Sequence, residues 1–262
     1  MTKAAQQIGE AYTNEFCPIC GGGGQHYHTH GDYEIDKCNL CGFIYTKHIP
    51  SNDFLKQYYD AAYRANSSNG VFVPKRTIGL KHWLLAGLLK TLVKNSVEKS
   101  TNRLLEIGCS QGVLLNKFKH DKTWHATGVD YGGAAIEYAQ TQGLDAHLSD
   151  IESMRFSDET FDAVVALHVM EHVQNLSAFI QEVHRVTKHG GYFFAVMPSM
   201  SHYKAKLAGS KWKYWGPPGH LWYFTNASLI LFLENNGFEI KHCSSFYHRA
   251  HVRVLAKVNR VK

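Results

Sequence analysis

From residue 103 to residue 198 the chain alternates between short apolar runs and amphipathic stretches, and this alternation limits the possible folds most. The apolar runs are 104–107, 124–130, 145–150, 161–168 and 190–198, and helical patterns occupy 132–143 and 176–190. A further helix is expected directly after residue 112. Strands that alternate with helices build a parallel sheet covered on both faces. Such α/β sheets bind ligands at the carboxyl ends of the strands, where the strand order reverses.

The first of these strands ends in the turn EIGCSQG, which has the composition of a nucleoside-binding turn. Gly108 and Gly112 allow the backbone to approach a ligand closely. Asp130 ends the next strand, where a carboxylate can accept hydrogen bonds from ribose hydroxyls, and Asp150 stands at the end of the third. A glycine turn alone serves any tight strand-to-helix connection. The two acids at neighbouring strand ends make a nucleoside cofactor the better interpretation.

Four of the six cysteines form two matching turns, CPICG and CNLCG. Two residues between thiolates let one tight turn present both sulfurs to one ion, and two such turns complete a tetrahedral shell with no open position. The sequence therefore predicts a structural zinc ribbon, a site that stabilises a small module and does no chemistry. Its expected ligands are Cys17, Cys20, Cys38 and Cys41.

The 262 residues suit one large domain with a small appendage. We expect a zinc-ribbon module at 1–50, a helical region at 51–100 with helices near 51–65 and 75–95, and the α/β domain at 101–262. The opening residues lack an apolar secretory core, and no apolar run approaches the ~18 residues of a membrane span. The expected compartment is the cytoplasm, where thiols stay reduced and paired cysteines suggest metal.

Four stretches resemble, in order, successive motifs of the class I S-adenosylmethionine-dependent methyltransferases: RLLEIGCSQG, TGVD, HLSDIESMRFSDETFDAVVALHVMEHV and GGYFFAVMP. The resemblance covers residues 103 to about 240. It implies a Rossmann-like seven-stranded sheet whose last strand is antiparallel, made by FEIKHCSSF and VRVLAKVNR, and S-adenosylmethionine as the cofactor. A dinucleotide oxidoreductase shares the glycine turn and its acid, but the HLSD and HVMEHV elements fit only the methyl-transfer pattern.

The resemblance also implies roles for single residues. Glu106 and Gly108 would lie under the methionine part of the cofactor, Asp130 would hold the ribose, Asp150 would meet the adenine amine and Ile151 would pack on the adenine ring. Serine at position 110 replaces the middle glycine of many family members and is small enough for the turn. The whole expected cofactor-binding set is Glu106, Gly108, Ser110, Gly112, Asp130, Asp150, Ile151 and His168.

The stretch HVMEH, residues 168–172, has the spacing of a zinc-peptidase helix. It follows directly on an apolar strand, however, so it begins at a strand's carboxyl end and faces the donor methyl. Methyl transfer needs alignment and, for a hydroxyl or acidic C–H acceptor, removal of a proton, which histidine suits. We expect Glu171 and His172 to be catalytic and His168 to order the loop. A related subgroup that methylates quinone-type phenols holds a divalent ion with a Glu and His here, so a divalent ion such as Mg²⁺ is the alternative.

Residues 198–228 follow the fifth strand, where the family places its substrate cover, and here they are rich in aromatic residues and lysines around GPPGH. His220 lies in this cover, and we expect it to stand opposite His172 across the acceptor pocket, with one of the two as the base. Residues 197–233 contain no Asp or Glu, and the chain carries a net charge of +6. Similar covers and cysteine modules occur in glycan and sugar methyltransferases. The sugar C-methyltransferases generally carry a further C-terminal domain, which we do not expect here.

The main hypothesis is a methyltransferase for a small acidic acceptor, a nucleotide-linked or glycan sugar. The alternative is an RNA methyltransferase that binds the phosphate backbone with its zinc ribbon and the basic residues after 240. A non-catalytic adaptor is the third interpretation, which the cofactor residues disfavour. The sequence leaves the oligomeric state open.

Overall fold

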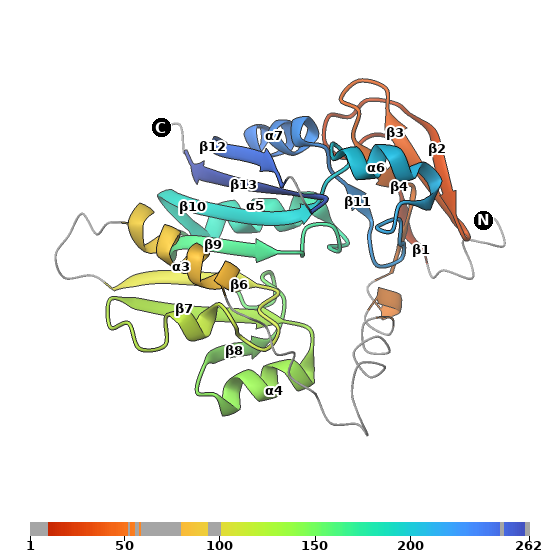
Figure 1. The fold of residues 1–262 in the computed structure, drawn as a ribbon. Coiled ribbons are helices and arrows are strands. Elements are labelled where there is room, and N and C mark those ends of the chain that lie inside the picture. Colours follow the sequence, from red (N-terminus) through yellow and green to blue (C-terminus); the bar gives the residue numbers. More distant parts are fainter. Residues whose placement is uncertain are drawn as a thin grey trace.

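The computed structural model describes residues 10–51, 53–55, 58, 80–93, 101–246 and 249–259. Its centre is a seven-stranded sheet in the order β12-β13-β10-β9-β6-β7-β8 (Figure 1). The strands β6 to β10 pair in parallel, whereas β13 is antiparallel to both of its neighbours. The predicted sheet with an antiparallel last strand is therefore confirmed. In chain order the strands are β6 (Asn102–Ile107), β7 (Trp124–Asp130), β8 (Asp145–Leu148), β9 (Phe161–Leu167), β10 (Thr187–Pro198), β12 (Phe238–Ser245) and β13 (His251–Val258).

Strand β9 shows why the sheet is buried on both faces. Val164 and Ala166 pack on the face that also holds the inner side of helix α5 (Leu176–Val186), and Ala163 and Val165 pack on the opposite face with α3 (Leu80–Leu92). Because side chains alternate along a strand, only a continuous apolar run can fill both layers.

The helices follow their sequence patterns. In α5, positions 176, 179, 180, 183 and 186 are buried, a helical spacing that puts one apolar stripe on the sheet, and the side chain of Asn175 caps the helix by accepting from the amide of Ala178. Helix α7 (Asn226–Asn235) begins with a capping box formed by Thr225 and Ser228. Helix α4 (Gly133–Thr141) follows β7, as expected.

Two predicted segments differ in the structure, and a third is described only in part. The helix expected after residue 112 is a tight 3-10 turn, η1 (Leu115–Lys117), flanked by irregular turns that bury Leu114, Leu115 and Phe118 within a short connection. The helix expected to reach residue 190 ends at Val186, because β10 begins at Thr187 and pairs with Phe161. In the middle region, 53–55, 58 and α3 are helical, and the rest of the two expected helices lies outside the described residues.

The cysteine module is a small sheet that one strand from the cover completes. Its order is β11-β4-β3-β2, so β11 (Trp222–Tyr223) pairs with β4 although nearly two hundred residues separate them (Figure 1). Buried residues of the module, including Phe43 and Tyr45, belong to the same core cluster as β9 and α5. The module is thus packed into the domain. The module's own strands in this sheet are β2 (Gly24–His30), β3 (Tyr33–Cys38) and β4 (Ile44–Thr46), and a separate two-stranded sheet pairs β1 (Glu10–Thr13) with β5 (His48–Pro50).

The cover leaves β10 and returns to the module through α6 (Tyr203–Ala208) and η2 (Gly209–Lys211). In Figure 1 it lies beside the module at the carboxyl ends of β9 and β10. Within the described part of the chain, no helix has the length and apolar character to cross a membrane.

Candidate active site

The turn after β6 is held by the carboxylate of Asp130 at the end of β7. Its Oδ2 accepts a hydrogen bond from the amide of Ser110 (2.8 Å), and its Oδ1 accepts one from the amide of Gly132 (2.7 Å). Ser110 has a φ of 49°, and Gly108 and Gly112 have φ values of 71° and 74°. Left-handed backbone at three positions explains why small residues make up this turn.

Gly108 also makes room for a neighbouring loop. A Cβ at this position would lie 2.4 Å from Cγ2 of Val169, in the loop that follows β9. The glycine was expected to allow close approach of a ligand, and the structure adds that it allows the HVMEH loop to lie against the turn.

Glu106 stands inside β6 below this turn and is 3% exposed. Burial and the nearby charge of Asp130 raise the pKa of its carboxyl well above the usual value, against a hydrogen bond from the backbone of Leu115. Its Oε2 is buried and has no hydrogen-bond partner within the described residues. An acceptor oxygen of this kind requires a donor from a ligand or from water.

The end of β8 carries a second set of side chains suited to a planar ring. Oδ2 of Asp150 accepts a hydrogen bond from the hydroxyl of Tyr131 (2.9 Å), and its Oδ1 accepts one from the amide of Ser153. Tyr131 is 60% exposed and Leu148 is 62% exposed. Sequence reasoning did not single out Tyr131, although it directly follows Asp130, the residue expected to hold the ribose. Ile151, expected on the adenine ring, is 1% exposed and packs in the main core cluster.

The loop after β9 places a buried carboxylate among histidines. Glu171 is 2% exposed, and its Oε1 lies 3.4 Å from Nδ1 of His168 and 3.9 Å from Nε2 of His172. Burial opposes ionisation of this carboxyl, but the hydrogen bond from His168 and the charges of the neighbouring histidines hold its pKa below the usual value. Its Oε2 is buried and has no partner in the described part of the chain.

His172 and His220 lie side by side, with ring centroids 4.7 Å apart. The expectation that they face each other across a pocket is therefore wrong, because the cover folds onto the loop. Nδ1 of His172 lies 2.6 Å from the carbonyl oxygen of Gly219, and Nδ1 of His220 lies 2.9 Å from that of Tyr214. A carbonyl can only accept, so each Nδ1 carries the hydrogen, and whenever the ring is neutral its Nε2 has the lone pair.

His251 and Tyr214 complete this group. Sequence reasoning had Tyr214 among the aromatic residues of the cover and missed His251. The ring of His251 lies 4.9 Å from that of His168, and its Nε2 is 3.2 Å from the hydroxyl of Tyr214. Burial and the His168 charge lower the pKa of His251 to about 4, and burial also lowers the pKa of His220. His251 begins the antiparallel strand β13, which sets it beside Pro198 at the carboxyl end of β10. That topology was the available signal.

A family model described as a methyltransferase domain matches residues 80–242, which is more than half of the chain. The match spans the cofactor turn, the acids at the strand ends and the histidine loop. The chain belongs to the class I S-adenosylmethionine-dependent methyltransferases.

Curated relatives of this methyltransferase act in different settings. The chain is 34% identical over 125 residues to a phthiotriol/phenolphthiotriol dimycocerosates methyltransferase 1 of Mycobacterium ulcerans, covering 44% of this chain and 45% of that protein. It is 30% identical over 149 residues to a ubiquinone biosynthesis O-methyltransferase of Methylobacterium nodulans, covering 52% and 59%. A probable tRNA methyltransferase 9B of Homo sapiens is 31% identical over 114 residues, covering 41% and 24%. The chain thus spans less than two thirds of the length of these relatives.

Solved structures show the same fold. A chain in the complex between the Haloferax volcanii Trm112 methyltransferase activator and a putative methyltransferase superposes with a TM-score of 0.59 at 13% identity, covering 79% of this chain and 99% of that one. A SAM-dependent methyltransferase from Methanosarcina mazei superposes with a TM-score of 0.51 at 22% identity, covering 62% and 95%.

The residues of the turn fit the cofactor of this family. The orphaned, buried Oε2 of Glu106 suits a cationic donor such as the ammonium of the methionine part. Both oxygens of Asp130 hold backbone amides, and a carboxylate oxygen can accept more than one hydrogen bond, as contact with a ribose hydroxyl would require. The methyltransferase therefore carries donor and acceptor chemistry suited to S-adenosylmethionine at the predicted strand ends.

One group in the methyltransferase's histidine cluster has the arrangement of a cation site. One ligand atom each from Glu171, His172 and His220 lie within 4.8 Å of one another. Both histidines donate their Nδ1 hydrogens to carbonyls, as metal-bound histidines do. Two imidazoles and one carboxylate are ligands of transition metals, whereas Mg²⁺ prefers oxygen donors.

The four cysteines of the module converge as their spacing predicted. Their sulfurs lie within 4.8 Å of one another, with 3.6 Å between Cys17 and Cys41 and 3.5 Å between Cys20 and Cys38. A tetrahedron of thiolates around zinc has edges of about 3.8 Å, so the spacing fits such an ion. Burial opposes ionisation of Cys38, yet the amides of Cys41 and Leu40 lower its pKa to about 7.

Proposed function

We propose that this methyltransferase methylates a small acidic acceptor, best a nucleotide-linked or glycan sugar, with a histidine of the cluster as general base. The observation that carries the proposal is the pair His172 and His220, whose Nδ1 atoms donate to carbonyls, so that in the neutral rings Nε2 is the basic atom, beside the buried carboxylate of Glu171. A sulfonium cofactor supplies an activated methyl group and a good leaving group. The chain's own residues then need to align the acceptor and take its proton.

The proton has a defined path in this arrangement. As the acceptor oxygen or carbon bonds to the methyl carbon and the carbon–sulfur bond breaks, the acceptor's proton moves to Nε2 of His172 or His220. The imidazolium that results lies next to Glu171, whose Oε1 is 3.9 Å from Nε2 of His172. A buried carboxylate stabilises that charge, as it does in hydrolase triads. Neutral His220 suits the same task, because burial lowers its pKa.

The charge of the surroundings favours an acidic acceptor. Lys213 lies on the ring of Tyr214 at 4.7 Å, and both Lys213 and Arg249 lower the pKa of His251 by their charge. The cover itself contains no acid between residues 197 and 233. A phosphate near these cations gains electrostatic attraction, and the aromatic faces of the cover suit a sugar or base.

We also propose that the four cysteines hold one structural zinc ion. The sulfur spacing and the absence of an open ligand position support this ion over a catalytic one. A divalent ion at Glu171, His172 and His220 is the alternative to a histidine base, and the ligand set favours a transition metal over Mg²⁺.

The experiment incubates the protein with S-adenosylmethionine carrying a labelled methyl group and offers nucleotide-linked sugars, their free sugars and tRNA. We expect label in a nucleotide-linked sugar and a shallow dependence on salt. Label in tRNA with affinity that falls steeply with salt supports the RNA alternative, since phosphate contacts release counterions. That alternative has a named precedent in the tRNA methyltransferase relative.

The role of the histidines is tested by alanine variants with the acceptor so identified. Loss of a positioned general base lowers the rate about 10²–10⁴-fold. We expect this of His172→Ala or His220→Ala, with S-adenosylhomocysteine affinity unchanged, whereas His125→Ala at the amino end of β7 keeps the wild-type rate. Activity lost on chelation and restored by a transition metal assigns the cluster to an ion. Wild-type rates in both His172→Ala and His220→Ala would contradict the proposal that one of these histidines is the general base.

A further inference from the structure

The cysteine module is joined to the acceptor site by consecutive backbone hydrogen bonds. The amide of Thr46 in β4 donates to the carbonyl of Leu221 (2.9 Å), and the amide of Leu221 donates to the carbonyl of Glu171 (2.8 Å). Leu221 directly follows His220 and precedes β11, which pairs with β4. One fully buried residue of the cover therefore connects the module to both parts of the histidine cluster.

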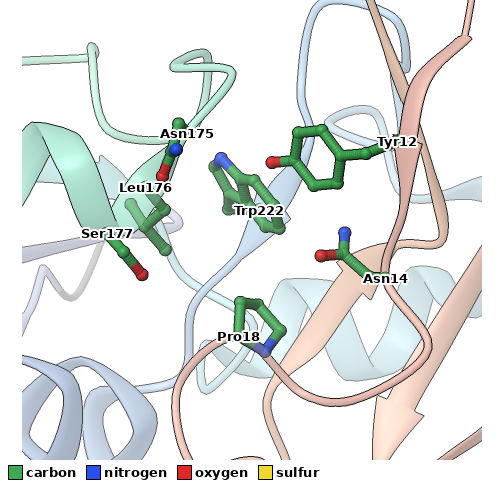
Figure 2. A pocket seen from close by; sticks show the side chains of 7 residues that line it. All are labelled: Tyr12, Asn14, Pro18, Asn175, Leu176, Ser177 and Trp222. Atoms are coloured by element: carbon green, nitrogen blue, oxygen red, sulfur yellow. The ribbon is translucent and has the colours of Figure 1, made fainter.

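A second connection runs through the side chain of Trp222. Its ring stacks on that of Phe43, with centroids 6.3 Å apart and planes 17° apart, and Phe43 follows the second cysteine turn. Its Nε1 donates to the carbonyl of Val173 (2.6 Å), the residue after His172. Figure 2 shows Trp222 between side chains of the module, among them Tyr12 and Asn14, and the start of α5.

Two further hydrogen bonds fix the same loop. The hydroxyl of Tyr12 donates to the carbonyl of Gln174 (2.6 Å), and the side chain of Gln174 donates to the carbonyl of Pro50 (2.8 Å). The loop is thus tied to the module at Glu171, by way of Leu221, and at residues 173 and 174. The cofactor turn depends on other partners, since Asp130 holds the amides of Ser110 and Gly132.

We propose that the cysteine module is a positioning element of the acceptor site, and that Trp222 is the positioning residue that connects it to His172. This inference rests on the zinc proposed above. A closed Cys₄ site does no chemistry, but a module this small depends on its metal for a defined structure. The metal therefore fixes Phe43 and β4, and these fix Leu221 and Trp222. Loss of the metal releases the histidine pair and leaves the cofactor turn in place.

The test compares Trp222→Phe with Trp212→Phe. Both tryptophans are buried, at 2% and 5% exposure, so the two changes remove the same atoms from similar surroundings. Only Trp222 donates a hydrogen bond to the loop, because Nε1 of Trp212 has no partner within the described residues. The pair therefore separates loss of the connection from loss of volume.

The readout needs no acceptor, so it is independent of whether the proposed methyl transfer is right. Nitrogen NMR of ¹⁵N-histidine-labelled protein reports which ring nitrogen carries the hydrogen, and His172→Gln and His220→Gln spectra assign the two signals. Weakly bound metal is first removed with EDTA, and zinc content is measured. We expect wild type and Trp212→Phe to carry the hydrogen on Nδ1 of both histidines. Trp222→Phe should show mixed tautomers at His172, with S-adenosylhomocysteine affinity within twofold of wild type.

The metal is tested with Cys38→Ser/Cys41→Ser, which should lose zinc and the fixed tautomers of both histidines and keep S-adenosylhomocysteine binding. Unchanged tautomers in Trp222→Phe and in the cysteine variant overturn the inference. An equal change in Trp212→Phe assigns the effect to packing and overturns it as well. If the cysteine variant does not fold, the inference is decided by Trp222→Phe and Trp212→Phe, which both retain the metal. If the purified wild-type protein contains no zinc, the proposed role of the metal is overturned. The role of Trp222 is then decided by the comparison of Trp222→Phe with Trp212→Phe.

Discussion

Replacing Asp130 with alanine should weaken the cofactor site in two separable ways. The carboxylate accepts from the buried amide of Gly132 at 2.7 Å and from the partly exposed amide of Ser110 at 2.8 Å. Water can replace the acceptor at Ser110, but an unsatisfied buried amide costs about 1–3 kcal/mol. For a chain of this size, each kcal/mol lowers the melting temperature by about 2–4 °C, so the free variant should melt about 2–12 °C lower.

Asp130→Ala should also lower cofactor affinity, and this effect is separate from the loss of stability. Losing a charged acceptor for the ribose costs about 1.5–3 kcal/mol, which corresponds to a dissociation constant about 10- to 150-fold higher. Calorimetry with S-adenosylhomocysteine measures this at a temperature where both proteins are folded.

Asp145→Ala is the matched control, because Asp145 accepts from Thr127 and pairs with His125 and His147 at the other end of the sheet. It should lower the melting temperature and leave affinity unchanged. Equal affinity in wild type and Asp130→Ala would refute the assignment of the ribose site, whatever the melting temperatures show.

Three further predictions concern the metal, the turn and the pH. Purified protein should contain about one zinc ion per chain by metal analysis, and zinc retained in full by Cys38→Ser would contradict the Cys₄ site. Gly108→Ala should destabilise the protein and abolish cofactor binding, since φ is 71° and the new Cβ meets a side chain at 2.4 Å, whereas Gly87→Ala in open space on α3 should stabilise it by about 0.5–1 kcal/mol in urea unfolding. Burial lowers the pKa of His82 to about 4. Between pH 6.5 and 4, His82 therefore binds a proton in the unfolded chain and not in the folded one. As the pH falls through this range, the free energy of unfolding decreases by up to about 1.4 kcal/mol per pH unit. His82→Leu should flatten that part of the curve, and an unchanged slope would count against a buried neutral His82.

The sheet and the cofactor edge were predictable because local patterns determine them. A run as short as FDAVVAL favours a strand buried on both faces, and the eleven-residue helix after Asn175 shows its apolar stripe directly after its capping residue. Two CxxCG turns likewise contain local geometry: in the second turn the amides of Leu40 and Cys41 donate to the sulfur of Cys38. In each case the information lies within about a dozen neighbouring residues.

What could not be predicted depends on contacts between distant segments. Strand β11 has two residues, too few for a periodic signal, and it exists because Trp222 and Tyr223 meet Tyr45 and Ile44. His251 joins the histidine cluster only because β13 runs antiparallel beside β10. The turn after Gly112 has helical composition, but burial of three apolar side chains in a short connection tightened it into 3-10 geometry.

The stretch HVMEH shows how backbone conformation decides the meaning of a motif. On one continuous helix, histidines at the first and fifth positions share a face and can converge on one ion. Here His168 directly follows strand β9 with a φ of 60°, and the residues after it form a turn. His168 consequently contacts Glu171 and His251, whereas His172 pairs with His220 of the cover. The ring that contacts His172 thus comes from the cover, whose strand β11 pairs with β4 of the cysteine module, and no spacing within the motif could have revealed it.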